Sequence, residues 1–210
     1  MNIDELKSVA NAIVARQKGV LAADESSPTI KKRFDSVQVE STEENRRRYR
    51  EILFTADGIE RCEAVTAQVL QAVFAELDAH RVQFEGMLLK PNMVIAGKKC
   101  AQQASVQEVA EATLRCLRRY VPAAVPGVVF LSGGQSAEDA TAHLNAMNAM
   151  GPQPWQVSFS YGRALQAPVL AAWRGQESNV AAAQQALRKR CRLNGLARDG
   201  QYDRAMEDAS

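Results

Sequence analysis

Four short apolar runs divide the 210-residue chain, and each is followed by polar or glycine-rich residues. The runs consist mostly of aliphatic, β-branched or aromatic residues and are bounded by glycine or proline, a pattern typical of fully buried parallel strands. They predict strands over residues 19–23, 86–89, 127–131 and 155–160.

Apolar residues recur at helical spacing between these runs. The periodicity predicts helices over residues 3–17, 60–77, 105–120, 136–149 and 178–193. In the second of these, Val65, Val69, Ala72 and Val73 form one apolar stripe. Ser105 with Glu108 three residues later is a capping-box pattern for the third. The alternation indicates a single α/β domain over residues 1–210, with parallel strands joined by right-handed crossovers.

The composition of the chain argues against several kinds of binding partner. The 26 lysines and arginines nearly balance the 24 aspartates and glutamates, for a formal charge of +2, which does not suggest a nucleic-acid or membrane partner. The four cysteines and two histidines lie far apart without metal-ligand spacing, so we expect scattered, buried and reduced thiols and no metal. No signal peptide or membrane span is apparent, and we expect a cytoplasmic protein.

Lys90 follows the apolar run 86–89 directly. Burial at such a position would lower the pKa of the amine, which could then attack a carbonyl. The alternative is a lysine whose ammonium reaches solvent at the strand end. Asp24 occupies the equivalent place after the first run, where it could steady a cationic intermediate or move protons. Its alternative role is an N-cap for a helix beginning near Thr29.

A phosphate site is suggested after the last two runs. Ser132-Gly133-Gly134-Gln135-Ser136 leads from a strand through two glycines into a helix, where backbone N–H groups can approach an anion. Glycine serves tight turns for purely steric reasons as well. Arg163 follows the next strand and can grip a phosphate with two hydrogen bonds. In a (β/α)₈ barrel, phosphate commonly binds between the last two strands.

Four segments together resemble the signature segments of class I fructose-bisphosphate aldolases. The segment LLKPNMV, which contains Lys90, is the most specific of them, because it holds that family's Schiff-base lysine. The matching segments are residues 19–26, 85–94, 129–136 and 159–166.

The resemblance implies a TIM-barrel fold, no cofactor, and a role for each matching residue. Lys90 would form the imine with the keto carbon of the substrate, and Asp24 would assist the proton transfers. The implied phosphate ligands are Ser132, Gly133, Gly134, Ser160, Gly162 and Arg163 for the strand tips late in the chain, and Ser26, Thr29, Lys32 and Arg33 for the loop early in it. Pro28 stands where the family usually has glycine.

The chain also departs from the family. The pattern breaks near residues 56–60, where the equivalents of barrel strands two to five are absent, on the order of 120 residues for a barrel of usual length. We therefore expect a partial barrel of about four parallel strands in the order 6-7-8-1, with exposed strand edges that invite self-association. The family's carboxylates after the fifth strand and its lysines after the third and fourth have no counterpart.

Two hypotheses of different class follow. The first is an aldolase that cleaves fructose 1,6-bisphosphate reversibly in glycolysis, binds sugar phosphates, and forms homo-oligomers as the family typically does. The second is a catalytically impaired remnant that binds phosphosugars or contacts other subunits, because loss of a general base costs about 10²–10⁴-fold in rate.

Overall fold

The structure, a computed structural model, describes residues 3–13, 40, 42, 58–98 and 100–208. The predicted first strand, residues 19–23, and residues 14–17 of the first predicted helix lie outside these ranges. The described elements are α1 (Ile3–Ile13), α4 (Ile59–Ala79), the 3₁₀ turn η1 (Phe84–Gly86), β1 (Leu88–Leu89), α5 (Val106–Tyr120), β2 (Gly127–Phe130), α6 (Ala137–Ala149), β3 (Gln156–Phe159), α7 (Arg163–Trp173), η2 (Glu177–Asn179), α8 (Val180–Arg198) and η3 (Arg204–Glu207).

The described strands form one parallel sheet in the order β1-β2-β3. Leu88 pairs with Gly127, and Phe130 pairs with Phe159. This order confirms the predicted arrangement of the sixth, seventh and eighth strands, whereas the place of the first strand is outside the described residues. β1 is shorter than predicted because the chain turns through η1 immediately before it, with the Met87 N–H donating to the Phe84 carbonyl at 3.3 Å.

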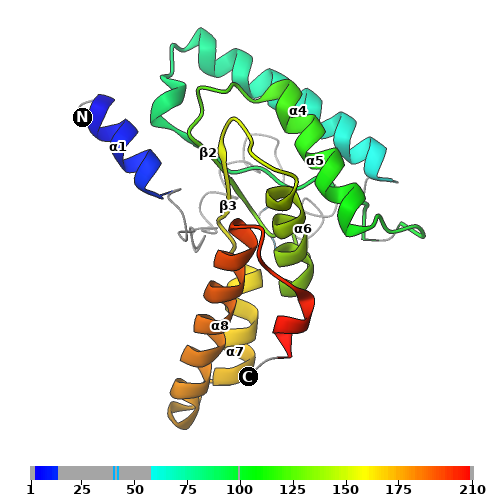
Figure 1. Ribbon diagram of the computed structural model, residues 1–210, viewed down its shortest axis with the longest axis vertical. Helices are drawn as coiled ribbons and strands as arrows, with labels where there is room; N and C mark the ends of the chain where they lie inside the picture. The colour runs from blue at the N-terminus through cyan, green and yellow to red at the C-terminus, as the bar shows by residue number, and fades with distance from the viewer. Residues whose placement is uncertain (1–2, 14–39, 41, 43–57, 99, 209–210) are drawn as a thin grey trace.

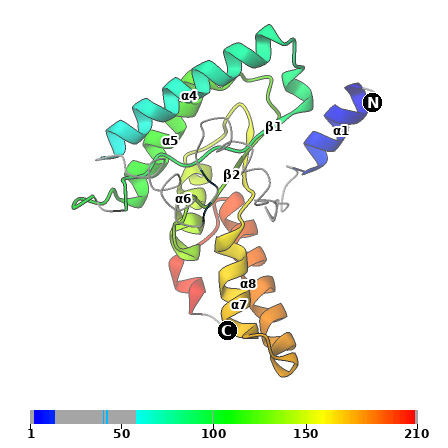
Figure 2. The ribbon, with the colours of Figure 1, turned by 180° about the vertical axis from the view of Figure 1, so that it is seen from behind.

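Helices pack around this small sheet. α4 lies beside α5 at one end of the molecule and α7 beside α8 at the other, with α6 between the two pairs (Figures 1 and 2). α1 lies apart from these helices and contacts η1, where Ile3 and Leu6 face Gly86 at 3.6 Å from the position of a β-carbon. The most deeply buried side chains of the core include Phe130, Leu114, Leu117, Leu144, Met147, Leu165 and Leu193. Burying each contributes about 1.5–3 kcal/mol.

Helix α5 shows how closely a local pattern can specify an element. Ser105 is its N-cap, and the Glu108 N–H donates to the Ser105 hydroxyl at 3.3 Å while Glu108 accepts from the Ser105 N–H at 2.7 Å. The backbone N–H of Ser105, followed by its hydroxyl, lowers the pKa of the Glu108 carboxyl. The predicted capping box is confirmed.

The apolar stripe expected in α4 is not its buried face. Val65, Val69 and Val73 are 48%, 54% and 39% exposed, whereas Thr66, Leu70 and Phe74 are buried. Both sets repeat every four residues, so the sequence offers two parallel stripes on neighbouring faces of the helix. The position of α5, which carries Arg115 in a bidentate ion pair to Glu63, decides which stripe is covered.

Helix α7 was not predicted. Pro168 lies inside it and removes one backbone donor, which disfavours a helix in the sequence pattern. Burial of Ala164 and Leu165 against the core compensates for that loss. A four-residue spacing of apolar side chains, from Leu165 to Val169, was the signal available.

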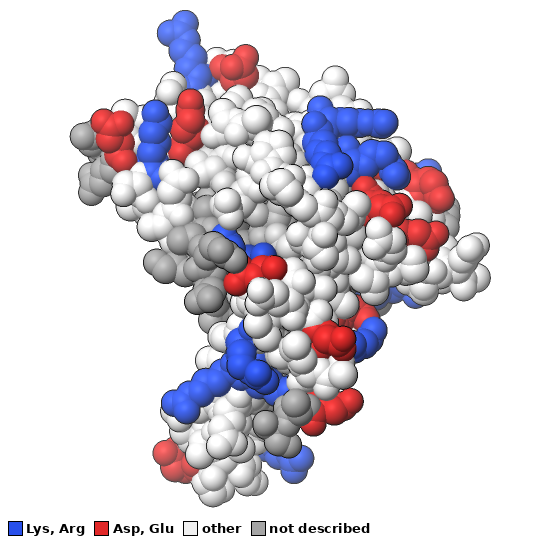
Figure 3. All heavy atoms as spheres, viewed as in Figure 1, with Lys and Arg blue, Asp and Glu red and all other residues white. Residues whose placement is uncertain are grey.

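None of the helices within the described ranges is long and apolar enough to cross a membrane. On the face seen in Figure 3, acidic and basic side chains lie next to one another.

Candidate functional site at the carboxyl ends of the strands

The ends of the three described strands are tied together in register. Beyond the last paired residues, the Leu131 N–H donates to the Pro91 carbonyl at 3.1 Å, and the Ser160 N–H donates to the Phe130 carbonyl at 2.8 Å. These bonds carry the ladder one step past the strands. The chain segments that hold Lys90, Ser132 and Arg163 therefore leave the sheet at the same edge, as the sequence predicts.

Lys90 has an exposed side chain, although Leu89 before it and Pro91 after it are buried. The structure therefore favours the alternative in which the ammonium reaches solvent over the buried amine considered in the sequence analysis. The physical reason is its place in the sheet, because β1 is the edge strand of the three described strands and has a neighbour on one side alone.

The Ser132–Gln135 segment forms a tight turn. Gly133 and Gly134 have φ angles of +58° and +80°, a left-handed conformation that glycine adopts without steric cost. The Gln135 N–H closes the turn by donating to the Ser132 carbonyl at 3.0 Å. Ser136 then caps α6, with its hydroxyl accepting from the Asp139 N–H at 2.9 Å. Of the described hydrogen bonds, none uses the N–H of Gly133 or Gly134, which are free to meet a ligand.

A buried histidine fixes this turn from behind. Nδ1 of His143 lies 2.5 Å from the side-chain oxygen of Gln135, whose amide group donates to the Ser132 carbonyl at 3.0 Å and contacts the Met93 sulfur at 3.6 Å. Burial lowers the pKa of His143 to about 4, with Arg204 acting in the same direction and Asp139 against it. At neutral pH the imidazole is uncharged and donates to Gln135. The turn and the loop after β1 are thereby joined.

The end of β3 is anchored to α6 as well. Tyr161 is fully buried, and its hydroxyl donates to the Ala140 carbonyl at 2.7 Å. Burial raises the pKa of this phenol, so it stays protonated. Gly162, two residues past the buried Ser160, is the N-cap of α7, and Arg163 is the first residue of that helix and has an exposed side chain. This anchor holds Arg163 at a fixed place on the strand edge.

Lys98, which the sequence reasoning missed, lies against the glycine turn. A β-carbon added to Gly134 would lie 2.9 Å from Nζ of Lys98 and 4.0 Å from Nη2 of Arg163. No spacing rule singles out this lysine, because it lies in a loop eight residues after Lys90 and reaches the turn through the tertiary structure alone. The predicted residues Asp24, Ser26, Thr29, Lys32 and Arg33 are outside the described residues.

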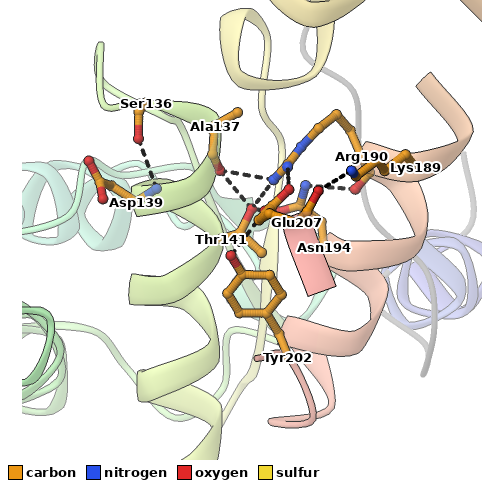
Figure 4. Close-up of polar contacts among 9 residues, drawn as sticks. All are labelled: Ser136, Ala137, Asp139, Thr141, Lys189, Arg190, Asn194, Tyr202 and Glu207. Atoms are coloured by element: carbon orange, nitrogen blue, oxygen red, sulfur yellow. Dashed lines mark hydrogen bonds and ion pairs between the residues drawn. The ribbon is translucent and has the colours of Figure 1, made fainter. Parts of the chain in front are cut away.

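A second polar cluster occupies the space between α6, α8 and η3 (Figure 4). Arg190 is 3% exposed and donates to Glu207 at 2.6 Å, to the Thr141 hydroxyl at 2.6 Å and to the Ala137 carbonyl at 3.1 Å. Its Nε is buried and has no hydrogen-bond partner among the described residues. The Tyr202 hydroxyl donates to the other oxygen of Glu207 at 2.9 Å. This cluster ties the C-terminal segment to α6.

A cavity of about 470 Å³ adjoins this cluster. Its lining residues are Glu138, Pro168, Ala186, Lys189, Arg190, Arg204, Glu207 and Asp208, and they include none of the predicted site residues. Because chemistry-bearing side chains meet at the strand ends instead, we assign the candidate site to that edge and the cavity to packing of the outer helices.

The described cysteines form no disulfide, and Cys191 is exposed, so they are not uniformly buried as expected. Burial raises the pKa of the Cys116 thiol to about 11, which makes it unreactive. Within the described residues, no group of three or more histidines, cysteines and carboxylates could hold a metal ion.

Comparison with known proteins points to one family. The family model described as fructose-bisphosphate aldolase class-I matches residues 5–60 and 56–210 in two stretches. Fructose-bisphosphate aldolase of Plasmodium falciparum (isolate K1 / Thailand) is 54% identical over 150 residues, 70% of this chain and 41% of that protein. Fructose-bisphosphate aldolase B of Gallus gallus is 56% identical over 145 residues, 69% of this chain and 40% of that protein. The chain thus spans about two fifths of the length of these relatives.

Two further matches extend over nearly the whole chain. Fructose-bisphosphate aldolase 1 of Toxoplasma gondii is 35% identical over 329 aligned positions, covering 94% of this chain and 91% of that protein. Since this chain has 210 residues, at least 119 of those positions, the difference of the two numbers, are gaps in it. A solved structure of fructose-bisphosphate aldolase from Plasmodium falciparum, in complex with TRAP and a small molecule inhibitor, superposes with a TM-score of 0.81 at 32% identity, covering 96% of each chain.

Proposed function

Because this chain belongs to the class I fructose-bisphosphate aldolase family, we propose that it cleaves fructose 1,6-bisphosphate reversibly to dihydroxyacetone phosphate and glyceraldehyde 3-phosphate, as part of glycolysis. The observation that carries this proposal is that Lys90, the Ser132–Gly134 turn and Arg163 leave one sheet edge together. A nucleophilic amine beside an anion site is the pairing that a phosphorylated ketone requires.

In the proposed reaction, the Lys90 amine attacks the keto carbon C2, and water leaves to give a protonated imine. The proton of the C4 hydroxyl departs to a base, the C3–C4 bond breaks, and its electron pair moves to the imine. Glyceraldehyde 3-phosphate leaves with its new carbonyl. The remaining enamine takes a proton at C3, and water hydrolyses the imine to release dihydroxyacetone phosphate. Asp24 is the group we propose for the proton transfers.

Two sets of residues would hold the substrate's phosphates in this proposal. The strand tips supply Ser132, Gly133, Gly134, Ser160, Gly162 and Arg163 for the phosphate on the ketone half. The loop after the first predicted strand supplies Ser26, Thr29, Lys32 and Arg33 for the other phosphate. Support for the first set comes from the unused N–H groups of the glycine turn and from the anchoring of Arg163 through Tyr161.

The chain is proposed to be a single partial barrel whose internal deletion junction lies near residues 56–60. Support comes from the family model, whose two matched stretches overlap at residues 56–60, and from the gaps against the Toxoplasma gondii relative. We propose sugar phosphates as ligands, the cytoplasm as location, and self-association. The exposed valines of α4 support the last of these, because an apolar stripe on a helix surface favours burial against another chain.

Borohydride trapping tests this function. The purified chain is incubated with dihydroxyacetone phosphate, reduced, and searched by mass spectrometry for an adduct on Lys90, with Lys90→Ala as the control. We expect an adduct in the parent chain alone, together with cleavage of the bisphosphate in a coupled assay. Identical labelling of both chains would refute the Schiff base. An adduct without cleavage would instead support the impaired remnant.

A further inference from the structure

Lys98 brings a second cation to the glycine turn from a separate part of the chain. Measured from the position of a β-carbon on Gly134, its Nζ is 2.9 Å away, its Cε 3.1 Å away, and Nη2 of Arg163 4.0 Å away. The ammonium and guanidinium nitrogens are therefore at most 6.9 Å apart, the sum of the first and last distances. One cation follows β1, and the other opens the helix after β3.

These two cations share no described counter-charge. Of the ion pairs and side-chain hydrogen bonds among the described residues, none involves the side chain of Lys98 or of Arg163, and both side chains are exposed. Like charges this close repel each other, and water screens that repulsion in part. An anion that contacts both would convert the repulsion into two attractive contacts.

The turn between them has the shape to complete such a site. Gly133 and Gly134 have consecutive left-handed φ angles, and their N–H groups take part in no described hydrogen bond. Because Gly134 has no β-carbon, the end of the Lys98 side chain can lie against the space that a β-carbon would fill. Any other residue at this position would displace Lys98 from the turn.

We infer that Lys98 is a specificity-determining residue that contacts the phosphate of a phosphomonoester ligand together with Arg163 and the Gly133–Gly134 turn. This inference rests on the proposed function, whose phosphate ligands it extends by one residue that the family resemblance did not supply. The dianion of a phosphomonoester has three terminal oxygens, enough for the ammonium, the guanidinium and a backbone N–H at once. A ligand without phosphate gains nothing from Lys98.

Calorimetric titration with inorganic phosphate tests the inference without any covalent step. The variants are Lys98→Gln, Lys98→Arg, Arg163→Gln, and the control Arg188→Gln, which removes another exposed cation, from α8. We expect Lys98→Gln to weaken phosphate binding about tenfold, the loss of one charge-assisted contact, and Lys98→Arg to retain most of the affinity. Thermal unfolding monitored by circular dichroism confirms that each variant is folded.

The outcomes separate this inference from the proposed function. Equal phosphate affinity in Lys98→Gln and the parent chain, or the same loss in Arg188→Gln, would overturn the role of Lys98, as would failure of the parent chain to bind phosphate. The Lys90 adduct is scored separately. Suppose that no Lys90 adduct forms while the chain still binds phosphate in a way that depends on Lys98. That result would refute the proposed aldolase reaction and support the proposed anion site.

Discussion

Two arginines near the start of α6 have opposite environments. Arg190 is 3% exposed, and its guanidinium is bonded to Glu207, Thr141 and a backbone carbonyl (Figure 4). Arg163 is exposed at the strand edge, with Lys98 as its neighbour and no described partner. The difference teaches that a cation whose donors are used internally holds the fold, whereas a cation without an internal partner is available to a ligand.

The largest expected effect is the loss of stability when the buried Arg190 is replaced. Arg190→Met leaves Glu207 partly buried without its cation, and removal of one member of a buried pair costs about 3–5 kcal/mol of the free energy of unfolding. Urea denaturation measures it, with the exposed neighbour Arg188→Met as the matched control. Equal midpoints for both variants would show that the Arg190 cluster contributes no more than a surface residue.

His143 is buried behind the glycine turn and bonded to Gln135, and its titration gives the next largest effect. Its pKa falls from an ordinary value near 6.5 to about 4 on folding, mainly through burial. The unfolded chain therefore binds more protons between these values, so stability is complete above pH 6.5 and is lost as pH falls toward 4. We expect about 2 kcal/mol of this loss between pH 7 and pH 5.

Urea denaturation at pH 7 and pH 5 checks this prediction. His143→Gln removes the titrating group, so its loss of stability over this interval is smaller than that of the parent chain by about the same 2 kcal/mol. The carboxylates titrate in both proteins and cancel in the difference. An unchanged pH dependence in the variant would contradict the assigned burial of a neutral imidazole.

The next prediction concerns Gly134→Ala, which changes the glycine turn beside the exposed Arg163. At a φ of +80° a methyl group costs about 1–2 kcal/mol, and here it would also lie 2.9 Å from Nζ of Lys98. Gly175→Ala is the matched control, since Gly175 has a φ of +71° with no atom within 4 Å of a β-carbon. We expect similar losses of stability, measured in urea, and loss of phosphate binding in Gly134→Ala alone. If both variants still bind phosphate, the glycine turn is not part of the anion site.

The smallest effect on stability belongs to Arg163→Gln. Because this guanidinium has no described partner, we expect the free energy of unfolding to stay within about 0.5 kcal/mol of the parent value. Phosphate affinity, measured by calorimetry, falls at least about tenfold, because a bidentate contact is lost. A marked loss of stability with unchanged affinity would reverse the roles assigned to the two arginines.

Much of the scaffold was predictable because its signals are local. The apolar runs at 127–131 and 155–160 became β2 and β3, and the Ser105–Glu108 capping box begins α5 as expected. Helix α7 was missed, because Pro168 argues against a helix locally and the burial that compensates for it comes from distant residues. Of the predicted site residues, those at the strand tips meet at one edge, while Asp24 and its neighbours stay predictions.

The sequence by itself determined which residues end the described strands, where the turn at Gly133 and Gly134 lies, and to which family the chain belongs, since motifs and caps are contacts between near neighbours. The tertiary structure alone decided which of two equally spaced stripes of α4 is buried, that Lys90 is exposed, and that Lys98 reaches the turn beside Arg163. The physical reason is that burial and charge pairing depend on what packs alongside, and those partners are distant in sequence.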